Sequence, residues 1–400
     1  MKFSKIALAA VVTVAAAQAQ AATVYLAGAS ATQANYRAAL VSLCAGTPTT
    51  IISTADTNKS AVKCSVDFTG LPGVNAVAIS VNGGSFTAVT TSVGNALETF
   101  VNVADNTGAT LTAPRQSEGG FLDIDAAAFP ASEYTTYGVT SAPATSSAKF
   151  SQVFGVAVSP ALYTALQTAQ GLTGCGVDSL TAACQPTISK PQYTSIVSDS
   201  FNTAKQDINA ILGVGTAGDL LKVCRRVATS GTQASSDQYF LNSFVGGDGA
   251  AAGALAPASE AVYGAGSGLT SYEVAEGSGT GNARTCLSGT GYALGVLSLE
   301  NAPDLTTRSG GQRADRKWRF VKVNGVHAYE PAVNSTATAK SGAYDFWFTS
   351  QKFGATANGT AVVDAIDNQL GSVNLPGLFG NDLVDVQAKR LSNTSPVFFN

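Results

Sequence analysis

A short apolar strand, a turn of small residues and a helix follow one another repeatedly along this chain. The predicted strands cover residues 23–27, 76–81, 154–160 and 220–227, and the helices after them cover residues 33–43, 93–101, 161–167 and 233–244. Two further strands are predicted over residues 272–275 and 293–298. Strands that alternate with helices build α/β folds with mostly parallel sheets, which bind ligands beyond the carboxyl ends of their strands. The sequence therefore predicts an α/β fold whose Gly-, Ser- and Thr-rich turns occupy ligand-binding positions.

The N-terminal segment has the three parts of a secretory signal peptide. Lys2 and Lys5 precede an apolar stretch over residues 6–17, and Ala19-Gln20-Ala21 supplies small residues for cleavage. The apolar stretch is too short to span a bilayer stably. We expect residues 1–21 to be removed, and the mature protein to be periplasmic or extracellular.

The composition gives no indication of a nucleic-acid or membrane-surface partner. The net charge is −3, and only 12% of the residues are charged, so nothing in the chain attracts nucleic acid or an anionic membrane. The mature chain of about 380 residues predicts roughly two domains. Residues 245–268 are dense in glycine and alanine and are expected to form a loop.

Six cysteines fit an oxidising compartment, where an even count favours disulfides. Six cysteines allow about fifteen pairings, of which we favour the sequential one. The pairs are then Cys44 with Cys64, Cys175 with Cys184, and Cys224 with Cys286.

The segment from Arg226 to Thr232 has the residues of an anion site at a strand-to-helix junction. Its sequence is Arg-Val-Ala-Thr-Ser-Gly-Thr. The first N–H groups of a helix have no intrahelical partner and carry the positive end of the helix dipole. Gly231 lets the backbone approach a ligand, and the guanidinium of Arg226 matches two oxygens of a tetrahedral anion. An ordinary helix cap, which has the same residues, remains the alternative.

Two other segments carry polar residues at comparable positions. The turn from Gly28 to Gln33 delivers hydroxyl and N–H groups to the start of a predicted helix. Asp125 follows the apolar residues of Phe121-Leu122-Asp123-Ile124-Asp125. From the residues alone, each of these is either a helix cap or part of a site.

Taken in order, these segments resemble the periplasmic phosphate-binding proteins, which are the substrate-binding components of phosphate ABC transporters. Gly-Ala-Ser-Ala-Thr-Gln from Gly28 resembles that family's opening turn, and Arg226 with Ser230-Gly231-Thr232 matches its Arg-x-x-x-Ser-Gly-Thr motif. Phe121 with Asp125 resembles its Phe-x-x-x-Asp segment. The segments at residues 293–297 and 341–344 are similar to later elements of the family, so the resemblance spans nearly the whole mature chain.

The resemblance implies a role for each matched residue. Thr32 and Gln33 would donate to the anion from one lobe, and Asp125 would accept the proton of hydrogenphosphate. A serine after the second strand also binds ligand in the family, and we assign Ser85 to it, with Ser117 as the alternative. The second lobe would contribute Arg226, Ser230, Gly231 and Thr232.

Two departures from the family pattern bear on the ligand. Ala228 stands where the family commonly has an acidic residue, and Gln33 stands where it usually has an aromatic one. The missing acid leaves more positive charge in the site, so sulfate, a phosphonate or an organic phosphate stays open beside inorganic phosphate.

The resemblance also implies an architecture and a partner. We expect the two-lobed periplasmic binding protein fold with two hinge crossovers, of the type II-like class. Lobe one would comprise residues 22–155 and 296–400, and lobe two residues 156–295. The protein would be a monomer without a cofactor that delivers phosphate or a related oxyanion to an ABC-transporter permease.

Two other functions were weighed against binding and transport. His327 is the single histidine, and no Gly-x-Ser-x-Gly motif accompanies it, so an enzyme is not expected. The run from Gly277 to Gly281 lacks the lysine of a phosphate-binding loop. A secreted scavenging or matrix protein that keeps the binding fold without a transporter remains the alternative.

Overall fold

The computed structural model describes residues 22–179, 181–198, 206–242, 272–328 and 336–399. The predicted signal peptide over residues 1–21 and the loop expected over residues 245–268 lie outside the described residues.

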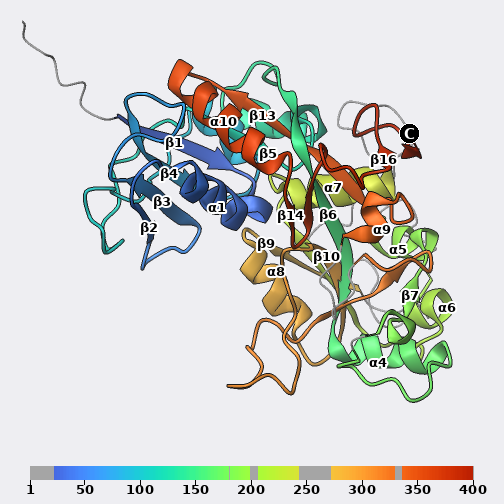
Figure 1. The fold of residues 1–400 in the computed structure, drawn as a ribbon. Helices are drawn as coiled ribbons and strands as arrows, with labels where there is room; N and C mark the ends of the chain where they lie inside the picture. Colours follow the sequence, from blue (N-terminus) through green and yellow to red (C-terminus); the bar gives the residue numbers. More distant parts are fainter. Residues whose placement is uncertain (1–21, 180, 199–205, 243–271, 329–335, 400) are drawn as a thin grey trace, which may run out of the picture.

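The described chain forms two lobes joined by one long strand, β6 (Ser146–Val158). The first part of β6 pairs with β13 (Trp347–Gly354) of lobe one, and its last five residues pair with β10 (Tyr292–Ser298) of lobe two. This strand makes one 13-stranded mixed sheet out of the two lobes. The α/β class and the two-lobed architecture predicted from the sequence are therefore confirmed (Figure 1).

Lobe one is built on a sheet with strand order β2-β3-β4-β1-β5-β13. Its strands are β1 (Ala22–Gly28), β2 (Pro48–Ile52), β3 (Lys59–Cys64), β4 (Val74–Ser80) and β5 (Gly119–Leu122), with β14 (Asn374–Leu375) and β15 (Leu378–Gly380) near β6. Its helices are α1 (Gln33–Leu43), α2 (Phe86–Ser92), α3 (Ala131–Thr136) and α10 (Ala357–Leu370). Helices α1 and α10 bury Leu40 and Ile366 in one apolar core with Val77 of the sheet.

Lobe two continues the sheet in the order β6-β10-β8-β9. Its other strands are β7 (Thr187–Ile188), β8 (Leu221–Arg226), β9 (Tyr272–Gly277), β11 (Arg319–Phe320) and β12 (Lys322–Val323). Its helices are α4 (Pro160–Ala169), α5 (Lys190–Val197), α6 (Ile208–Leu212), α7 (Gly231–Leu241) and α8 (Thr280–Leu287). The chain then passes α9 (Ala337–Lys340) on its way to β13 and closes with the hairpin β16 (Ala388–Lys389) and β17 (Phe398–Phe399).

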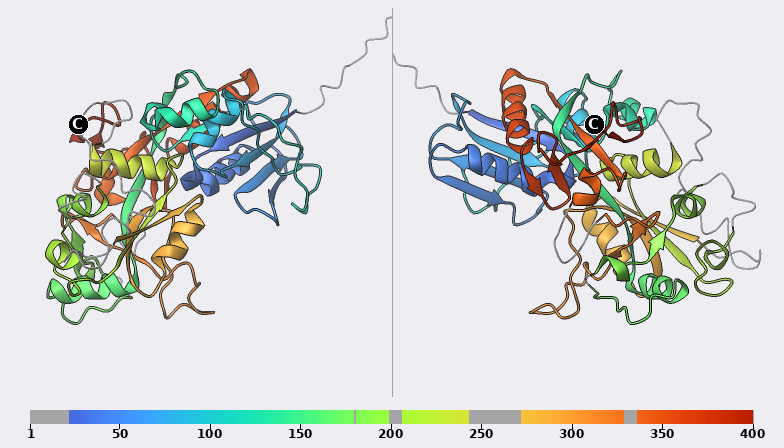
Figure 2. Two further views of the ribbon diagram at one scale, coloured as in Figure 1. Left: turned by 180° about the vertical axis from the view of Figure 1, so that it is seen from behind. Right: turned by 45° about the vertical axis from the view of Figure 1, so that its right-hand side comes forward.

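The return from lobe two to lobe one comes later than residue 296. Strand β11 pairs with β6 at the end that also carries β10, and β12 pairs with β7. Residues 319–323 therefore lie on lobe two, and the chain re-enters lobe one with β13 (Figure 2).

Local sequence signals account for the starts of α4 and α5. The hydroxyl of Ser159 accepts the N–H of Leu162 at 3.3 Å, and Pro160 occupies the first turn of α4. Ser189 and Gln192 form a capping box at α5. The helix predicted over residues 93–101 is wrong, because the helix of this region is α2, which ends at Ser92.

The orientation of the parallel strands determines where a ligand site is built. Strands β4 and β5 run parallel to β1 in lobe one. In lobe two, β8 pairs in parallel with β10 on one side and with β9 on the other. The segments that follow β1, β4, β5, β8 and β9 meet between the lobes. Hydrogen bonds there join Ser30 to Thr280, Ser85 to Asp123, and Thr229 to Gly83.

Six cysteines form three disulfides in the sequential pairing. These are Cys44–Cys64, Cys175–Cys184 and Cys224–Cys286. The bridge from Cys224 to Cys286 joins β8, which carries Arg226, to α8.

Candidate anion-binding site

A buried carboxylate from lobe one lies at the centre of the contact between the lobes. Asp123 directly follows β5 and is 1% exposed. The hydroxyl of Ser85 donates to its Oδ2 atom at 3.0 Å and accepts its backbone N–H at 3.2 Å. The other carboxylate oxygen, Oδ1, has no hydrogen-bond partner. A buried acceptor without a donor is costly, so this atom is available to a ligand that brings a proton.

A buried guanidinium reaches the same place from lobe two. Arg226 is the last residue of β8 and is 2% exposed. Its Nη1 donates to Thr280 Oγ1 at 2.8 Å, and its Nη2 donates to the carbonyl of Ser278 at 2.9 Å. Its Nε has no partner. The start of α8 therefore holds the guanidinium plane in a fixed orientation while leaving one donor unused.

The start of α7 packs directly against the carboxylate. A Cβ atom placed on Gly231 would lie 2.2 Å from Ser85 Oγ and 2.5 Å from Asp123 Oδ2. The hydroxyl of Ser230 makes no cap hydrogen bond to its own helix. Because the first N–H groups of a helix have no intrahelical acceptor, α7 presents donors and the positive end of its dipole beside Asp123.

One backbone hydrogen bond and one side-chain hydrogen bond join the two lobes next to these side chains. The N–H of Phe86 donates to the carbonyl of Thr229 at 3.1 Å, and the Thr229 hydroxyl donates to the carbonyl of Gly83 at 3.2 Å. Gly84 has φ +86°, and a Cβ atom placed on it would lie 3.6 Å from Arg226 Nη2. The guanidinium of lobe two therefore lies against the α2 turn of lobe one, and the two lobes are in contact at the site.

The site combines an acid and a base whose charges are both made costly by burial. Burial raises the pKa of Asp123 to about 6, although the Ser85 hydrogen bond and the charge of Arg226 lower it. Burial likewise lowers the pKa of Arg226 to about 10, and the charge of Asp123 opposes this shift. The two described side chains form no direct ion pair, and each keeps one unpartnered polar atom. A ligand that accepts from Arg226 and donates to Asp123 satisfies both atoms.

The structure brings together four of the residues that the sequence predicts for the site. Ser85 and Gly231 are in contact, and Arg226 and Ser230 lie beside them at the same junction. Thr32 is buried, with its hydroxyl near the carbonyl of Ala29, and the neighbouring Ser30 lies 3.5 Å from the Thr280 hydroxyl. The turn after β1 thus reaches the start of α8. Thr232 is buried in the first turn of α7.

Three predicted residues have contacts elsewhere. The amide of Gln33 donates to the carbonyl of Thr57 and to Ser60 Oγ. Asp125 is half-buried, and burial raises its pKa. A hydrogen bond from Asn393 of the C-terminal segment partly offsets this rise. Ser117, the alternative to Ser85, is bonded to Thr91 and Ser92.

Sequence reasoning missed Asp123, Ser278 and Thr280. Asp123 is the first residue after β5, so the position of the strand end was the signal that could have selected it over Asp125. Thr280 belongs to the run Gly277–Gly281, in which no local signal indicates that its hydroxyl contacts Arg226.

Replacing Asp123 by asparagine should change how stability depends on pH. The folded pKa of about 6 lies above the ordinary aspartate value of 3.8, so the ionised form is disfavoured by folding. The contribution of Asp123 to the free energy of unfolding therefore falls as the pH rises from about 4 to about 6. We expect the stability of Asp123→Asn relative to the wild type to rise by about 2–3 kcal/mol between pH 4 and pH 7. Urea unfolding at both pH values measures this difference, and a constant difference would contradict the raised pKa.

The described residues carry no group of three or more His, Cys, Asp or Glu side chains that could hold a metal ion. In the same part of the chain, no helix combines the length and the apolar character that crossing a membrane requires.

No protein-family model matches this sequence, and neither does the sequence of any curated protein. Solved structures do resemble it. A phosphate-binding protein from Stenotrophomonas maltophilia aligns with 92% of this chain and 89% of its own, at 14% identity and a TM-score of 0.43. A protein assigned as a phosphate ABC transporter substrate-binding protein from Clostridium perfringens, solved with bound phosphate, aligns with 88% and 93%, at 14% identity and a TM-score of 0.42. PstS from Borrelia burgdorferi aligns with 90% and 98%, at 10% identity and a TM-score of 0.33.

The solved structures that this chain resembles include phosphate-binding proteins.

Proposed function

We propose that this protein is an exported solute-binding protein that captures phosphate between its two lobes. The observation that carries the proposal is the pair formed by Asp123 and Arg226. Both side chains are at least 98% buried, they come from different lobes, and each retains an unpartnered polar atom. A tetrahedral oxyanion that bridges them satisfies both atoms and accepts from the start of α7 as well.

The carboxylate selects among oxyanions by their protons. Above its pKa an ionised Asp123 only accepts hydrogen bonds, so it pairs with the proton of hydrogenphosphate. Sulfate has no proton at neutral pH, and its oxygens would meet the carboxylate oxygen with two negative charges in contact. The selectivity role that the family resemblance gave to Asp125 is therefore assigned in this proposal to Asp123.

Binding in this proposal is completed by closure of the lobes. The hydrogen bonds of Thr229 with Phe86 and Gly83 join the lobes in the closed form, and the ligand adds contacts to both. A ligand that contacts both lobes shifts the population towards closure. The closed monomer then delivers its anion in the periplasm to an ABC-transporter permease, and no catalytic step or cofactor is involved.

Calorimetric titration at pH 8 with phosphate and with sulfate tests the proposal. The mature protein, refolded to remove bound ligand, is expected to bind phosphate and to give no heat with sulfate. Asp123→Asn should weaken phosphate binding by about tenfold or more and permit sulfate binding, because the amide donates as well as accepts.

Asp125→Asn is the matched control for this experiment. It removes the same charge two residues away, where the side chain contacts Asn393, so it should leave both titrations unchanged. If Asp125→Asn admits sulfate and Asp123→Asn does not, Asp125 is the selecting residue. If the wild type binds neither anion, the phosphate proposal fails.

A further inference from the structure

The segment after β9 repeats the Ser-Gly-Thr sequence that begins α7. Ser278-Gly279-Thr280 follows β9, and Ser230-Gly231-Thr232 follows β8. The two strands pair in parallel, with Arg226 opposite Gly277. Because the carboxyl ends of parallel strands meet at one edge of a sheet, both Ser-Gly-Thr turns lie at the same edge of lobe two.

Thr280, the first residue of α8, has a hydroxyl hydrogen without a close acceptor. Nη1 of Arg226 donates to Thr280 Oγ1 at 2.8 Å, and a guanidinium accepts no hydrogen bond, so the hydroxyl directs its own hydrogen elsewhere. Among the described residues, its other hydrogen-bond partner is Ser30 Oγ at 3.5 Å. That separation is well beyond the usual O–H···O distance of about 2.7–2.8 Å. The Thr280 hydroxyl is therefore a donor that the protein leaves largely unused.

The pair formed by Thr280 and Ser30 spans the two lobes. Ser30 lies in the turn between β1 and α1 of lobe one, and α8 lies below α1 on lobe two (Figure 1). Two hydroxyl oxygens 3.5 Å apart can both reach a third oxygen placed between them at a normal hydrogen-bond distance. An oxygen in that place also lies near the Arg226 guanidinium, which Thr280 contacts. An anion oxygen supplies the acceptor that both hydroxyls lack.

Local contacts hold Thr280 in place without using its side chain. The Cys224–Cys286 disulfide ties α8 to β8, the strand that carries the guanidinium. The N–H of Gly279 donates to Asn282 Oδ1 at 3.0 Å, which fixes the turn before the helix. A change of the Thr280 side chain should therefore leave α8 intact.

We propose that Thr280 is a ligand-binding residue of lobe two, which donates its hydroxyl hydrogen to an oxygen of the captured anion. This inference rests on the proposed function and adds a contact from a segment that the family resemblance did not match. The oxygen lies between residues of both lobes, so the contact belongs to the closed form and favours closure.

Calorimetric titration of Thr280→Val with phosphate tests the inference. Valine has the shape of threonine without the hydroxyl, so the affinity should fall by about tenfold, as expected for the loss of a hydrogen bond to a charged group. Thr280→Ser keeps the hydroxyl and should bind phosphate within about threefold of the wild type. Thr285→Val makes the same change at an exposed position of the same helix and should leave the affinity unchanged.

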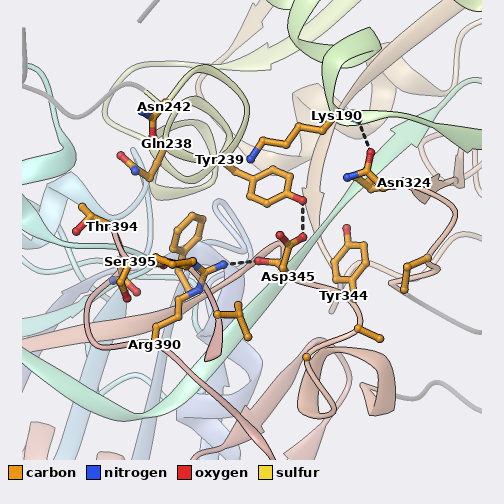
Figure 3. A pocket seen from close by; sticks show the side chains of 18 of the residues that line it. Lys190, Gln238, Tyr239, Asn242, Asn324, Tyr344, Asp345, Arg390, Thr394 and Ser395 are labelled. Atoms are coloured by element: carbon orange, nitrogen blue, oxygen red, sulfur yellow. Dashed lines mark hydrogen bonds between the residues drawn. The ribbon is translucent and has the colours of Figure 1, made fainter. Parts of the chain in front are cut away.

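A cavity away from the anion site supplies a second control. It has a volume of about 530 Å³ and lies at the other end of α7, where the hydroxyl of Tyr239 donates to Asp345 (Figure 3). Thr394→Val removes a hydroxyl group from the lining of this cavity. Phosphate affinity should match that of the wild type, because neither Arg226 nor Thr280 lines the cavity.

A double variant separates a direct contact from an effect through Arg226, because Thr280→Val also removes one acceptor of the guanidinium. If Thr280 contacts the anion, Thr280→Val weakens phosphate binding by about tenfold in the Arg226→Ala background as well. Equal binding by Arg226→Ala and the double variant means that Thr280 acts only through Arg226, and it overturns the inference. Wild-type affinity in Thr280→Val overturns the inference and leaves the proposed function standing, whereas absence of phosphate binding to the wild type removes both.

Discussion

Replacement of Arg226 by alanine is expected to weaken phosphate binding by at least about 100-fold while the protein still folds. The guanidinium is 2% exposed and is held at the start of α8 by two hydrogen bonds. Truncating one partner of a buried, charge-assisted contact commonly costs about 2–5 kcal/mol. Calorimetry on the purified variant measures the loss.

The fold should survive this substitution because Asp123 can take up a proton. Its pKa of about 6 is already raised by burial, and the charge of Arg226 is one of the factors that lower it. Without Arg226 the pKa rises further, so the carboxyl takes up a proton more readily and the cost of leaving its charge unpaired is reduced. Circular dichroism and thermal unfolding at pH 7 should therefore show a folded protein of reduced stability.

Arg308→Ala is the control for the loss of a positive charge. The Arg308 side chain is 45% exposed, and its partner Asp304 keeps a shorter ion pair with Arg313. Phosphate affinity should not change in this variant. If Arg226→Ala binds phosphate as the wild type does, Arg226 is not part of the site and the binding proposal loses its main cation.

The parts of the fold that local sequence determines were predictable. Strand β1 with α1, and β8 with α7, are each separated by a turn of Gly, Ser and Thr, and both pairs were found within a few residues of their true ends. Arg226, Ser230 and Gly231 could be predicted as site residues because they lie together at one strand-to-helix junction.

Helix α2 was misplaced because its sequence is a poor helix former. Phe-Thr-Ala-Val-Thr-Thr-Ser is rich in β-branched and aromatic residues, which have low helix propensity. Phe86, Ala88 and Val89 are fully buried, so tertiary packing determines the helix there. That packing joins segments that are distant in sequence and leaves no local signal.

The contacts at the centre of the site also join residues that are distant in sequence. Ser85 and Asp123 are 38 residues apart, and Thr229 bonds a carbonyl 146 residues away. Asp123 and Asp125 look alike in the sequence, and the pairing of β5 with β1, which ends at Phe121, places Asp123 next to Ser85. The family resemblance pointed to Asp125, which lies two positions beyond the residue that contacts Ser85.

Gly231→Ala is expected to reduce phosphate affinity by about 100-fold, because it separates the start of α7 from lobe one. Alanine suits the backbone of this first helical residue, so the effect comes from its side chain. The added methyl group would lie 2.2 Å from Ser85 Oγ and 2.5 Å from Asp123 Oδ2, and both of these atoms belong to buried side chains. Overpacking of this kind typically costs about 1–3 kcal/mol of stability.

A matched glycine at the start of α8 separates this effect from helix propensity. A Cβ atom placed on Gly281 meets only the far end of the Arg284 side chain, at 3.9 Å. Gly281→Ala should therefore leave phosphate binding unchanged and be neutral or slightly stabilising, because alanine restricts the unfolded chain more than glycine does. Calorimetry and scanning calorimetry on both variants measure the contrast.

Removing the atom that the new methyl group meets should restore part of the affinity. In the double variant Ser85→Ala with Gly231→Ala, the nearest contact is gone, so binding should be tighter than in Gly231→Ala alone even though the Ser85 hydroxyl is lost. If the two glycine variants bind phosphate equally well, the close approach of α7 to Asp123 is not required for binding. The anion would then have to be held by Arg226 and lobe two without closure.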